Sequence, residues 1–392
     1  MDRFAMNDFR IPWAKPFVGA EEIAAVLSAL TERRMSMGAD VRSFERQTAE
    51  MVGRAHGIAV ANGTVALDVA MKLIDLRAGD EVLVSSLSYI ATTNCIFWQG
   101  ARPVFADVDP VTLNIDPRDA ASRVTARTRA LIVADYCGSP VDYDALTRLC
   151  DRHGLQLVVD GAQSLGAYFR GRPTISHGIV ATTSFHTAKA MICGEGGMVF
   201  CDADALAERA RKLRGQGEIP GRKYVHDTLA YNYRLTEIAA AIGRVQLGRA
   251  PEILARRAAL AERYTEQLST LAEVQPTGHS PFGTPAWFSF AVRVPNRDAV
   301  AERLRELGVE TRSLYPLPAY RQPIAEYQEL APSLCPQAEL ASSEVLNLPM
   351  FYEMTGEEVD DVVDCLATAI AEQRLTAQPV PGDAPHVGFR AA

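Results

Sequence analysis

The sequence of 392 residues has no apolar run that approaches the roughly 20 residues needed for a membrane-spanning helix. Residues 1–10 carry charges but not the apolar centre of a secretory signal, so we expect a cytoplasmic protein. Positive charge is also scarce, because 40 lysines and arginines stand against 48 acidic residues, a net charge of −8. We therefore expect neither a membrane nor nucleic acid among its partners.

Metal and disulfide chemistry have little support. The seven cysteines are an odd number, and no two of them form a C-x-x-C pair. We expect free thiols in a reducing compartment and no bound metal. A plain nucleotide-binding module is disfavoured as well, because neither a G-x-G-x-x-G turn nor a Walker lysine follows the first predicted strand.

What the sequence does have is a series of short apolar runs that alternate with amphipathic helical patterns. Apolar residues follow one another within each run, which is typical of strands buried on both faces of a parallel sheet. We predict an α/β fold with a mostly parallel seven-stranded sheet and helices on both faces. The predicted strands are 57–62, 81–86, 103–108, 130–135, 155–160, 179–185 and 197–201.

The pattern changes in the last third of the chain. We predict a large domain over 1–250, a smaller C-terminal α+β domain over 251–375, and a flexible tail over 376–392, which is rich in proline, glycine and alanine. Strands are predicted at 287–294, 309–315 and 345–349. Helices are predicted at 66–76, 142–153, 204–214, 236–247, 251–271, 297–307 and 355–374.

Ligands of parallel α/β sheets bind beyond the carboxyl ends of the strands, so the residues that follow the apolar runs are the candidates. Gly63 and Thr64 open a helix and form a potential anion site, although most such turns are only helix caps. Tyr89 could stack on a planar ring or be an ordinary rim tyrosine. Asp160 ends an apolar strand, where burying a carboxylate is costly unless a cationic group lies beside it. It could hold a protonated ring nitrogen, or it could be an ordinary loop or helix-cap aspartate.

Lys189 lies in a glycine-flanked turn after the sixth apolar run. Burial would lower the pKa of its amine and make it a candidate for a Schiff base, whereas a lone lysine here would more often face solvent. Taken together, the four points have one explanation. Gly63, Thr64 and Ser184 would hold a phosphate, Tyr89 a ring, Asp160 a protonated ring nitrogen and Lys189 an imine, a set that fits pyridoxal 5′-phosphate.

At this point the sequence resembles the DegT/DnrJ/EryC1/StrS family of pyridoxal-phosphate-dependent sugar aminotransferases of fold type I. The resemblance extends from residue 11 to about residue 374. It rests on six ordered motifs: NGTVAL (62–67), SLSYIATTN (86–94), PVFADVD (103–109), VVDGAQSLGA (158–167), SFHTAK…GEGG (184–197) and AYNYRLTEIAAAIG (230–243).

The resemblance implies roles for the residues that contact the cofactor ring. Lys189 would carry the internal aldimine and act as general base, and Asp160 would hold the pyridinium proton. Gln163 would contact the ring hydroxyl, and Tyr89 stands at the ring-stacking position. A dehydratase branch of the family has histidine in place of the lysine, so Lys189 favours transamination.

The phosphate site follows in the same way. The resemblance assigns Thr64, Val65 and Ser184 to the phosphate, together with Asn232 from a second subunit. The implied assembly is a homodimer with shared active sites. The role of His186, two residues beyond Ser184, stays open between catalysis and packing.

The resemblance also implies the reaction. Glutamate or glutamine would donate an amino group that passes to a nucleotide-linked keto-deoxysugar, a 4-keto-6-deoxyhexose, because residues 213–224 resemble enzymes that make 4-amino-4,6-dideoxy sugars such as perosamine. The alternatives are an aminotransferase for cyclitols or other ketones and a non-catalytic regulator that binds the cofactor. Candidate ligands of the substrate diphosphate are Arg214, Arg222, Lys223, Arg234 and Arg312.

Overall fold

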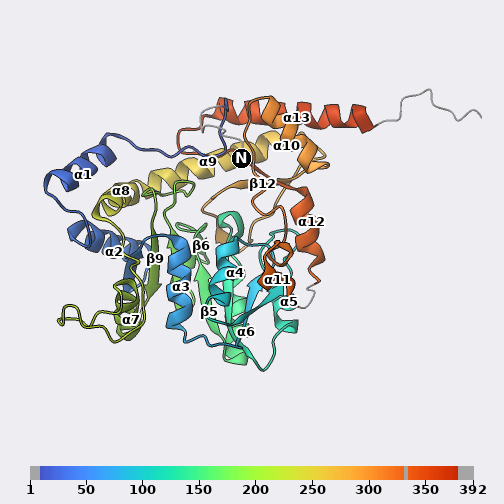
Figure 1. Ribbon diagram of the computed structural model, residues 1–392. Helices are drawn as coiled ribbons and strands as arrows, with labels where there is room; N and C mark the ends of the chain where they lie inside the picture. The colour runs from blue at the N-terminus through green and yellow to red at the C-terminus, as the bar shows by residue number, and fades with distance from the viewer. Residues whose placement is uncertain (1–8, 331–333, 378–392) are drawn as a thin grey trace, which may run out of the picture.

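The computed structural model describes residues 9–330 and 334–377 and contains a seven-stranded sheet. In Figure 1 this sheet lies among the helices of the lower half, below α9, α10 and α13. The strand order is β1-β9-β8-β5-β4-β2-β3. Neighbours from β3 to β8 pair in parallel, whereas β9 is antiparallel to β8 and to β1, so the predicted mostly parallel sheet is confirmed. The strands are β1 (His56–Val60), β2 (Glu81–Ser85), β3 (Arg102–Ala106), β4 (Thr128–Ala134), β5 (Gln156–Asp160), β8 (Val180–Ser184) and β9 (Gly197–Cys201).

Helices cover both faces of this sheet, and each face has its own apolar core. One core packs α3 (Gly63–Leu73), α4 (Ile90–Phe97) and α7 (Asp204–Arg214) against the strands. The other packs α2 (Ala39–Val52), α5 (Pro117–Ser122), α6 (Tyr143–His153) and α8 (Glu237–Gly248) against the opposite face. Both faces are therefore buried, as the unbroken apolar runs predicted.

The C-terminal elements build a third apolar core around an antiparallel sheet of order β10-β12-β13. Ile11 packs in this core, and its N–H donates to the Gly308 carbonyl over 3.0 Å. The division of the chain at residue 250 stays a prediction. The elements are α9 (Ala250–Leu268), β10 (Gln275–Pro276), β12 (Phe290–Arg293), α10 (Arg297–Glu306), β13 (Val345–Leu348) and α13 (Gly356–Ala377).

The strand predicted at 309–315 is wrong. Only Val309 and Arg312 form isolated bridges, and the segment then crosses toward the large sheet. Pro316 and Pro318 follow directly, and a proline cannot donate a ladder hydrogen bond. This segment therefore delivers Tyr315 to the carboxyl edge of the large sheet, where the site described below lies.

The sequence patterns did not indicate helices α2, α4 and α5, nor the elements that follow. A third sheet has the order β11-β6-β7, with β6 (Tyr168–Phe169), β7 (Arg172–Pro173) and β11 (Gly283–Thr284). The remaining helices are α1 (Ala20–Thr31), α11 (Ala325–Gln328) and α12 (Pro336–Glu344), with 3₁₀ turns at Tyr136–Gly138, Thr174–Ser176 and Ala319–Arg321. The predicted tail lies outside the described residues except for 376–377, which end α13. In the described ranges we find no helix long and apolar enough to cross a bilayer.

Candidate active site

The start of α3 and the end of β8 form a narrow cradle. Because β1 runs parallel to β8, the turn after β1 and Ser184 lie at the same edge of the sheet. A Cβ atom on Gly63 would lie 2.8 Å from the Cβ of Ser184, closer than side chains tolerate. Only glycine therefore allows this approach, which places the Ser184 hydroxyl beside the helix N-terminus, a favourable position for an anion.

Two of the first amides of α3 are available to a ligand. The Val65 N–H donates to the Asn62 side-chain oxygen over 2.9 Å, and Asn62 thereby caps the helix. Gly63 and Thr64 line the adjoining cavity, whereas Val65 does not. The geometry thus brings Gly63, Thr64 and Ser184 together, and the role of Val65 toward a phosphate stays a prediction.

Asp160 ends β5 at the floor of the same cavity. The Thr92 hydroxyl donates to its Oδ2 over 2.7 Å, and the Ala162 N–H donates to its Oδ1 over 3.1 Å. Burial raises the pKa of Asp160, while these two donors and the charge of Lys189 act in the opposite direction. The two donors and Lys189 only partly offset the cost of burying this negative charge. A further cationic N–H group beside the carboxylate would therefore be favourable.

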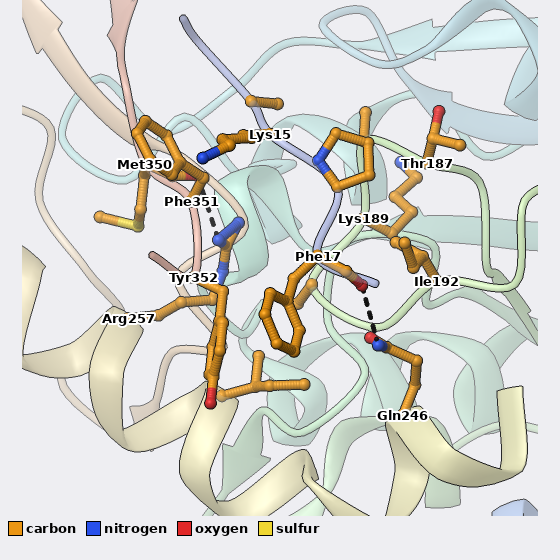
Figure 2. A pocket seen from close by; sticks show the side chains of 15 residues that line it. Lys15, Phe17, Thr187, Lys189, Ile192, Gln246, Arg257, Met350, Phe351 and Tyr352 are labelled. Carbon is orange, nitrogen blue, oxygen red and sulfur yellow. Dashed lines mark hydrogen bonds between the residues drawn. The ribbon is translucent and has the colours of Figure 1, made fainter. Parts of the chain in front are cut away.

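Lys189 lies in the loop after β8, with its ammonium 4.4 Å from the centre of the Phe288 ring. Removal from water lowers the pKa of Lys189 to about 8, although attraction to Asp160 partly opposes the shift. A cavity of about 20 Å³ adjoins the stem of this side chain. Figure 2 shows Arg257 on the opposite side of that cavity, where its guanidinium donates to the Met350 carbonyl.

The main cavity, of about 510 Å³, joins these groups into one site. Of the residues predicted from the sequence, it is lined by Gly63, Thr64, Tyr89, Asp160, Gln163, Ser184 and Lys189. Tyr89 is 61% exposed, so one face of its ring is open. Asn232 is exposed and does not line the cavity of its own chain.

His186 lies at the edge of the cavity rather than in its centre. The Ala188 N–H donates to its Nδ1 over 3.2 Å, and its Nε2 lies 3.8 Å from the Glu195 carboxylate. It also lines a neighbouring groove of about 650 Å³, together with Trp13. His186 is exposed in the single chain, and its role stays open between catalysis and packing.

The predicted diphosphate ligands are not gathered in one place. Arg214 is buried, pairs with Glu45 and donates to the Ala59 carbonyl over 3.1 Å, so its interpretation as a substrate ligand is wrong. Arg312 pairs with Glu310 beside the 650 Å³ groove. The remaining candidates lie on the segment after α7: Arg222, Lys223 and Arg234.

Several lining residues escaped the sequence analysis. Phe288 and Tyr315 come from the C-terminal third of the chain, and Thr92 follows the motif tyrosine by three residues. Thr92 lies within SLSYIATTN, so the motif could have indicated it. Phe288 and Tyr315 lie within the strands predicted at 287–294 and 309–315, but the structure has both residues outside its strands, and the predicted strands gave no reason to place either residue at the site.

The donor set fits pyridoxal phosphate. A helix N-terminus with a serine beside it suits a dianionic phosphate, a buried carboxylate suits a protonated ring nitrogen, and an amine with a pKa of about 8 suits bonding to an aldehyde. All three line one cavity. Within the described ranges, no cluster of histidine, cysteine and acidic side chains is arranged to hold a metal.

Comparison with known proteins shows the family of this chain. The sequence model of the DegT/DnrJ/EryC1/StrS aminotransferase family matches residues 16–367. DesV of S. venezuelae, crystallised with a ketimine intermediate, is 35% identical over 92% of this chain and 98% of its own, with a TM-score of 0.87.

Two further crystal structures are similar over almost their whole length. DesI in the presence of its TDP-sugar product is 31% identical over 95% of this chain and 96% of its own, with a TM-score of 0.86. 3-Amino-5-hydroxybenzoic acid synthase is 29% identical over 93% of this chain and 100% of its own, with a TM-score of 0.86. The chain therefore belongs to the DegT/DnrJ/EryC1/StrS family and is a pyridoxal-phosphate-dependent aminotransferase.

Proposed function

We propose that the protein transfers an amino group from glutamate or glutamine to the ketone of a nucleotide-linked deoxysugar, a 4-keto-6-deoxyhexose. The observation that carries the proposal is the single cavity that joins Lys189, Asp160 and the Gly63–Ser184 cradle. The similarity to DesI, crystallised with a TDP-sugar product, supports the nucleotide sugar.

Each of these residues has a defined task in the proposed reaction. Bound pyridoxal phosphate supplies an aldehyde that exchanges amino groups and a ring that accepts electrons. The Gly63 and Thr64 amides and the Ser184 hydroxyl bind the phosphate, and Asp160 holds a proton on the ring nitrogen. The Lys189 amine would take the proton from the carbon that bears the donor's amino group and deliver it to the aldehyde carbon of the cofactor, for which a pKa of about 8 is well placed.

The lowered pKa of Lys189 predicts how the apoenzyme captures its cofactor. Only a neutral amine attacks an aldehyde, so the capture rate is expected to rise with pH through about 8, instead of through the ordinary lysine value of 10.5. At pH 7 about a tenth of the amine is then neutral. Stopped-flow mixing of apoenzyme with pyridoxal phosphate between pH 6 and 10 measures this, and a midpoint above 10 would contradict the buried-amine assignment.

Asp160→Asn is expected to keep the fold and to slow the glutamate half-reaction by about tenfold to a hundredfold, the effect of losing a hydrogen bond to a charged group. The asparagine oxygen can replace Oδ1 and accept from the Ala162 N–H, and the Thr92 hydroxyl, which donates to Oδ2 in the wild type, can rotate and accept from the new NH2 group. Stopped-flow absorbance with glutamate measures the rate. Asp135→Asn is the matched control, because Asp135 is a buried acid that follows β4 and does not line the cavity. An unchanged rate in Asp160→Asn would remove this carboxylate from the mechanism.

The proposed enzyme is a homodimer in which each cavity is completed by its partner. Asn232 supports this, because it lies at the base of an exposed loop, where Gly215 and Asn232 form a bridge, and is exposed without lining its own cavity. Leu229 in that loop is 95% exposed. Tyr224, Val225 and Tyr231 of the same segment are exposed as well, and a group of exposed apolar side chains, unlike a single one, supports an interaction surface.

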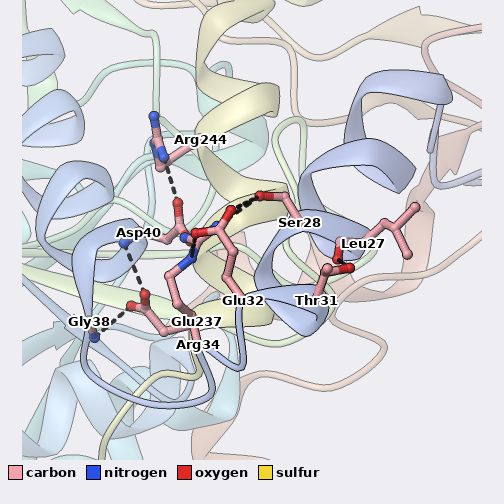
Figure 3. Close-up of polar contacts among 9 residues, drawn as sticks. All are labelled: Leu27, Ser28, Thr31, Glu32, Arg34, Gly38, Asp40, Glu237 and Arg244. Carbon is pink, nitrogen blue, oxygen red and sulfur yellow. Dashed lines mark hydrogen bonds and ion pairs between the residues drawn. The ribbon is translucent and has the colours of Figure 1, made fainter.

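Helix α1 adds a second exposed apolar surface. Ile23, Leu27 and Leu30 share one face of the helix and are all exposed. Polar contacts hold the chain after α1 onto α8: Arg34 and Arg244 both pair with Asp40, as Figure 3 shows, while Leu27 points away from this cluster. The apolar face is thus presented by a firmly anchored helix, as a subunit interface requires.

The proposed dimer would also supply positive charge for the diphosphate of the nucleotide-linked sugar. No arginine lines the cavity within the described part of the chain, yet a nucleotide diphosphate needs cations. Arg222, Lys223 and Arg234 lie on the segment that carries Asn232. In the proposed dimer, these cations reach the neighbouring cavity together with Asn232.

Two alternatives to the proposed function remain: an aminotransferase for a different substrate, and a regulator that binds the cofactor without catalysis. Similarity to 3-amino-5-hydroxybenzoic acid synthase, which is named for a product without a nucleotide, favours a cyclitol or another ketone as the second candidate. A panel of nucleotide keto-sugars and keto-cyclitols, assayed with glutamate and with glutamine, separates the two substrate classes. A regulator without turnover would bind pyridoxal phosphate, but glutamate would leave its visible absorbance unchanged.

A further inference from the structure

The backbone of a neighbouring loop fixes the side-chain amide of Gln163 in one orientation. The Cys137 N–H donates to Gln163 Oε1 over 2.9 Å. An N–H can only donate, so the amide oxygen must face Cys137 and the amide nitrogen must face the other way. There Nε2 donates to the Tyr315 hydroxyl oxygen over 2.5 Å. The Tyr315 oxygen is therefore an acceptor in this bond, and its own hydrogen is left for another oxygen.

The loop that orients Gln163 is held firmly. Cys137 has a φ of 52°, a left-handed conformation that is rare for a residue with a side chain, and its carbonyl accepts from the Phe288 N–H over 3.0 Å. A Cβ on the following Gly138 would lie 2.7 Å from the Gln163 carbonyl oxygen. Strained backbone of this kind persists where the surrounding structure fixes it, often at functional sites.

Tyr315 is fixed from its other side. The Leu314 N–H contacts Asn347 Oδ1 at 3.3 Å, and Asn347 Nδ2 contacts Cys137 Sγ at 3.4 Å. Asn347 is completely buried on β13. The same residue thus ties the segment that carries Tyr315 to the loop that orients Gln163, so the spacing of the two side chains is set by the fold.

Two hydrogens remain without a protein acceptor among the described residues: the second N–H of Gln163 and the O–H of Tyr315. Both side chains line the main cavity with Lys189 and Asp160. The family resemblance already places Gln163 at the ring hydroxyl oxygen of the cofactor. We propose that Tyr315 is a second donor to that oxygen and also positions Gln163. This inference rests on the proposed function, because it requires pyridoxal phosphate in the cavity. Burial raises the pKa of Tyr315, which keeps its hydroxyl protonated as a donor.

Tyr315→Phe tests the site with two measurements that do not depend on turnover. Equilibrium binding of pyridoxal phosphate to the apoenzyme is expected to weaken about two- to tenfold, as for the loss of one hydrogen bond. A pH titration of the visible absorbance of the bound cofactor is expected to show a higher midpoint. Donors to the ring oxygen stabilise its negative charge, so removing one makes the shared proton harder to remove.

The matched control is Tyr320→Phe. Tyr320 lies five residues away in the same segment, donates to Glu339 over 2.8 Å and does not line the cavity. It is expected to leave both the cofactor affinity and the absorbance midpoint unchanged. A thermal unfolding scan of both variants reports any general loss of stability.

The double variant Gln163→Ala with Tyr315→Phe tests whether the two donors form one site. Coupling predicts that Tyr315→Phe has a smaller effect once Gln163 is absent. Fully multiplicative losses of affinity would overturn the shared site, and so would a Tyr315→Phe protein that differs from wild type only in thermal stability. If the wild-type apoenzyme gains no visible absorbance with pyridoxal phosphate, the proposed function itself fails, which is a distinct result.

Discussion

Replacing Lys189 by alanine is expected to lower turnover by at least ~100-fold, the usual contribution of one positioned proton-transfer group. The variant loses the amine that would bond to the aldehyde of the cofactor and move the substrate proton. The cradle of Gly63, Thr64 and Ser184 remains, so Lys189→Ala should still bind pyridoxal phosphate without a covalent bond. Turnover with glutamate and the identified acceptor, together with borohydride trapping and mass spectrometry, measures both effects.

Lys15→Ala is the matched control for this experiment. Lys15 lines the small cavity that adjoins the Lys189 stem, but its ammonium pairs with Glu353 at 2.8 Å and it has no task in the proposed reaction. It is expected to keep wild-type turnover and covalent trapping at Lys189. If Lys189→Ala transaminates near the wild-type rate, or if trapping labels a different lysine in the wild-type protein, the assignment of the nucleophile is wrong.

The large sheet was predictable because burial on both faces leaves a simple trace in the sequence. Each of its seven strands lies within or beside an unbroken apolar run, and β9 spans the predicted residues 197–201. Helix α1 and the small sheet containing β6 were not predicted. Helix α1 has apolar residues, Ile23 and Leu27, on its exposed face, so its sequence does not show the polar outer face expected of a surface helix. Strand β6 has only two residues, too few to show the alternation of a strand.

The site was predictable only in part, for a similar reason. Asp160, Ser184 and Lys189 follow buried strands, and the ends of such strands converge on one edge of the sheet. Tyr315 and Phe288 reach that edge from segments at least 99 residues farther along the chain, through contacts such as the hydrogen bond from Gln163 to Tyr315. Long-range contacts of this kind leave no local pattern. Arg214 was predicted as a ligand of the substrate diphosphate because it lies in a motif shared with sugar aminotransferases, but the structure buries it against Glu45.

Asn232→Ala is expected to weaken cofactor binding by between a few-fold and about a hundredfold without unfolding the protomer. A neutral hydrogen bond contributes about 0.5–1.5 kcal/mol and one to a charged phosphate about 1.5–3 kcal/mol. Among the described residues of its own chain, the side chain makes only a long contact of 3.4 Å with the Arg234 N–H, so the fold loses little. Equilibrium binding of pyridoxal phosphate to the apoenzyme measures the effect, and unchanged affinity would exclude Asn232 from every phosphate site.

A mixed dimer separates action within one chain from action across the interface. Chains with Lys189→Ala and chains with Asn232→Ala, each impaired alone, can be co-expressed with different tags and the hybrid purified. If Asn232 serves the partner's cavity, one site of the hybrid carries both lesions and the other carries neither, because a two-fold interface exchanges equivalent residues. Activity at limiting pyridoxal phosphate should then return to about half of the wild-type value per dimer. If Asn232 serves its own chain, each site of the hybrid carries one lesion, and a purified hybrid without recovery would overturn the shared site.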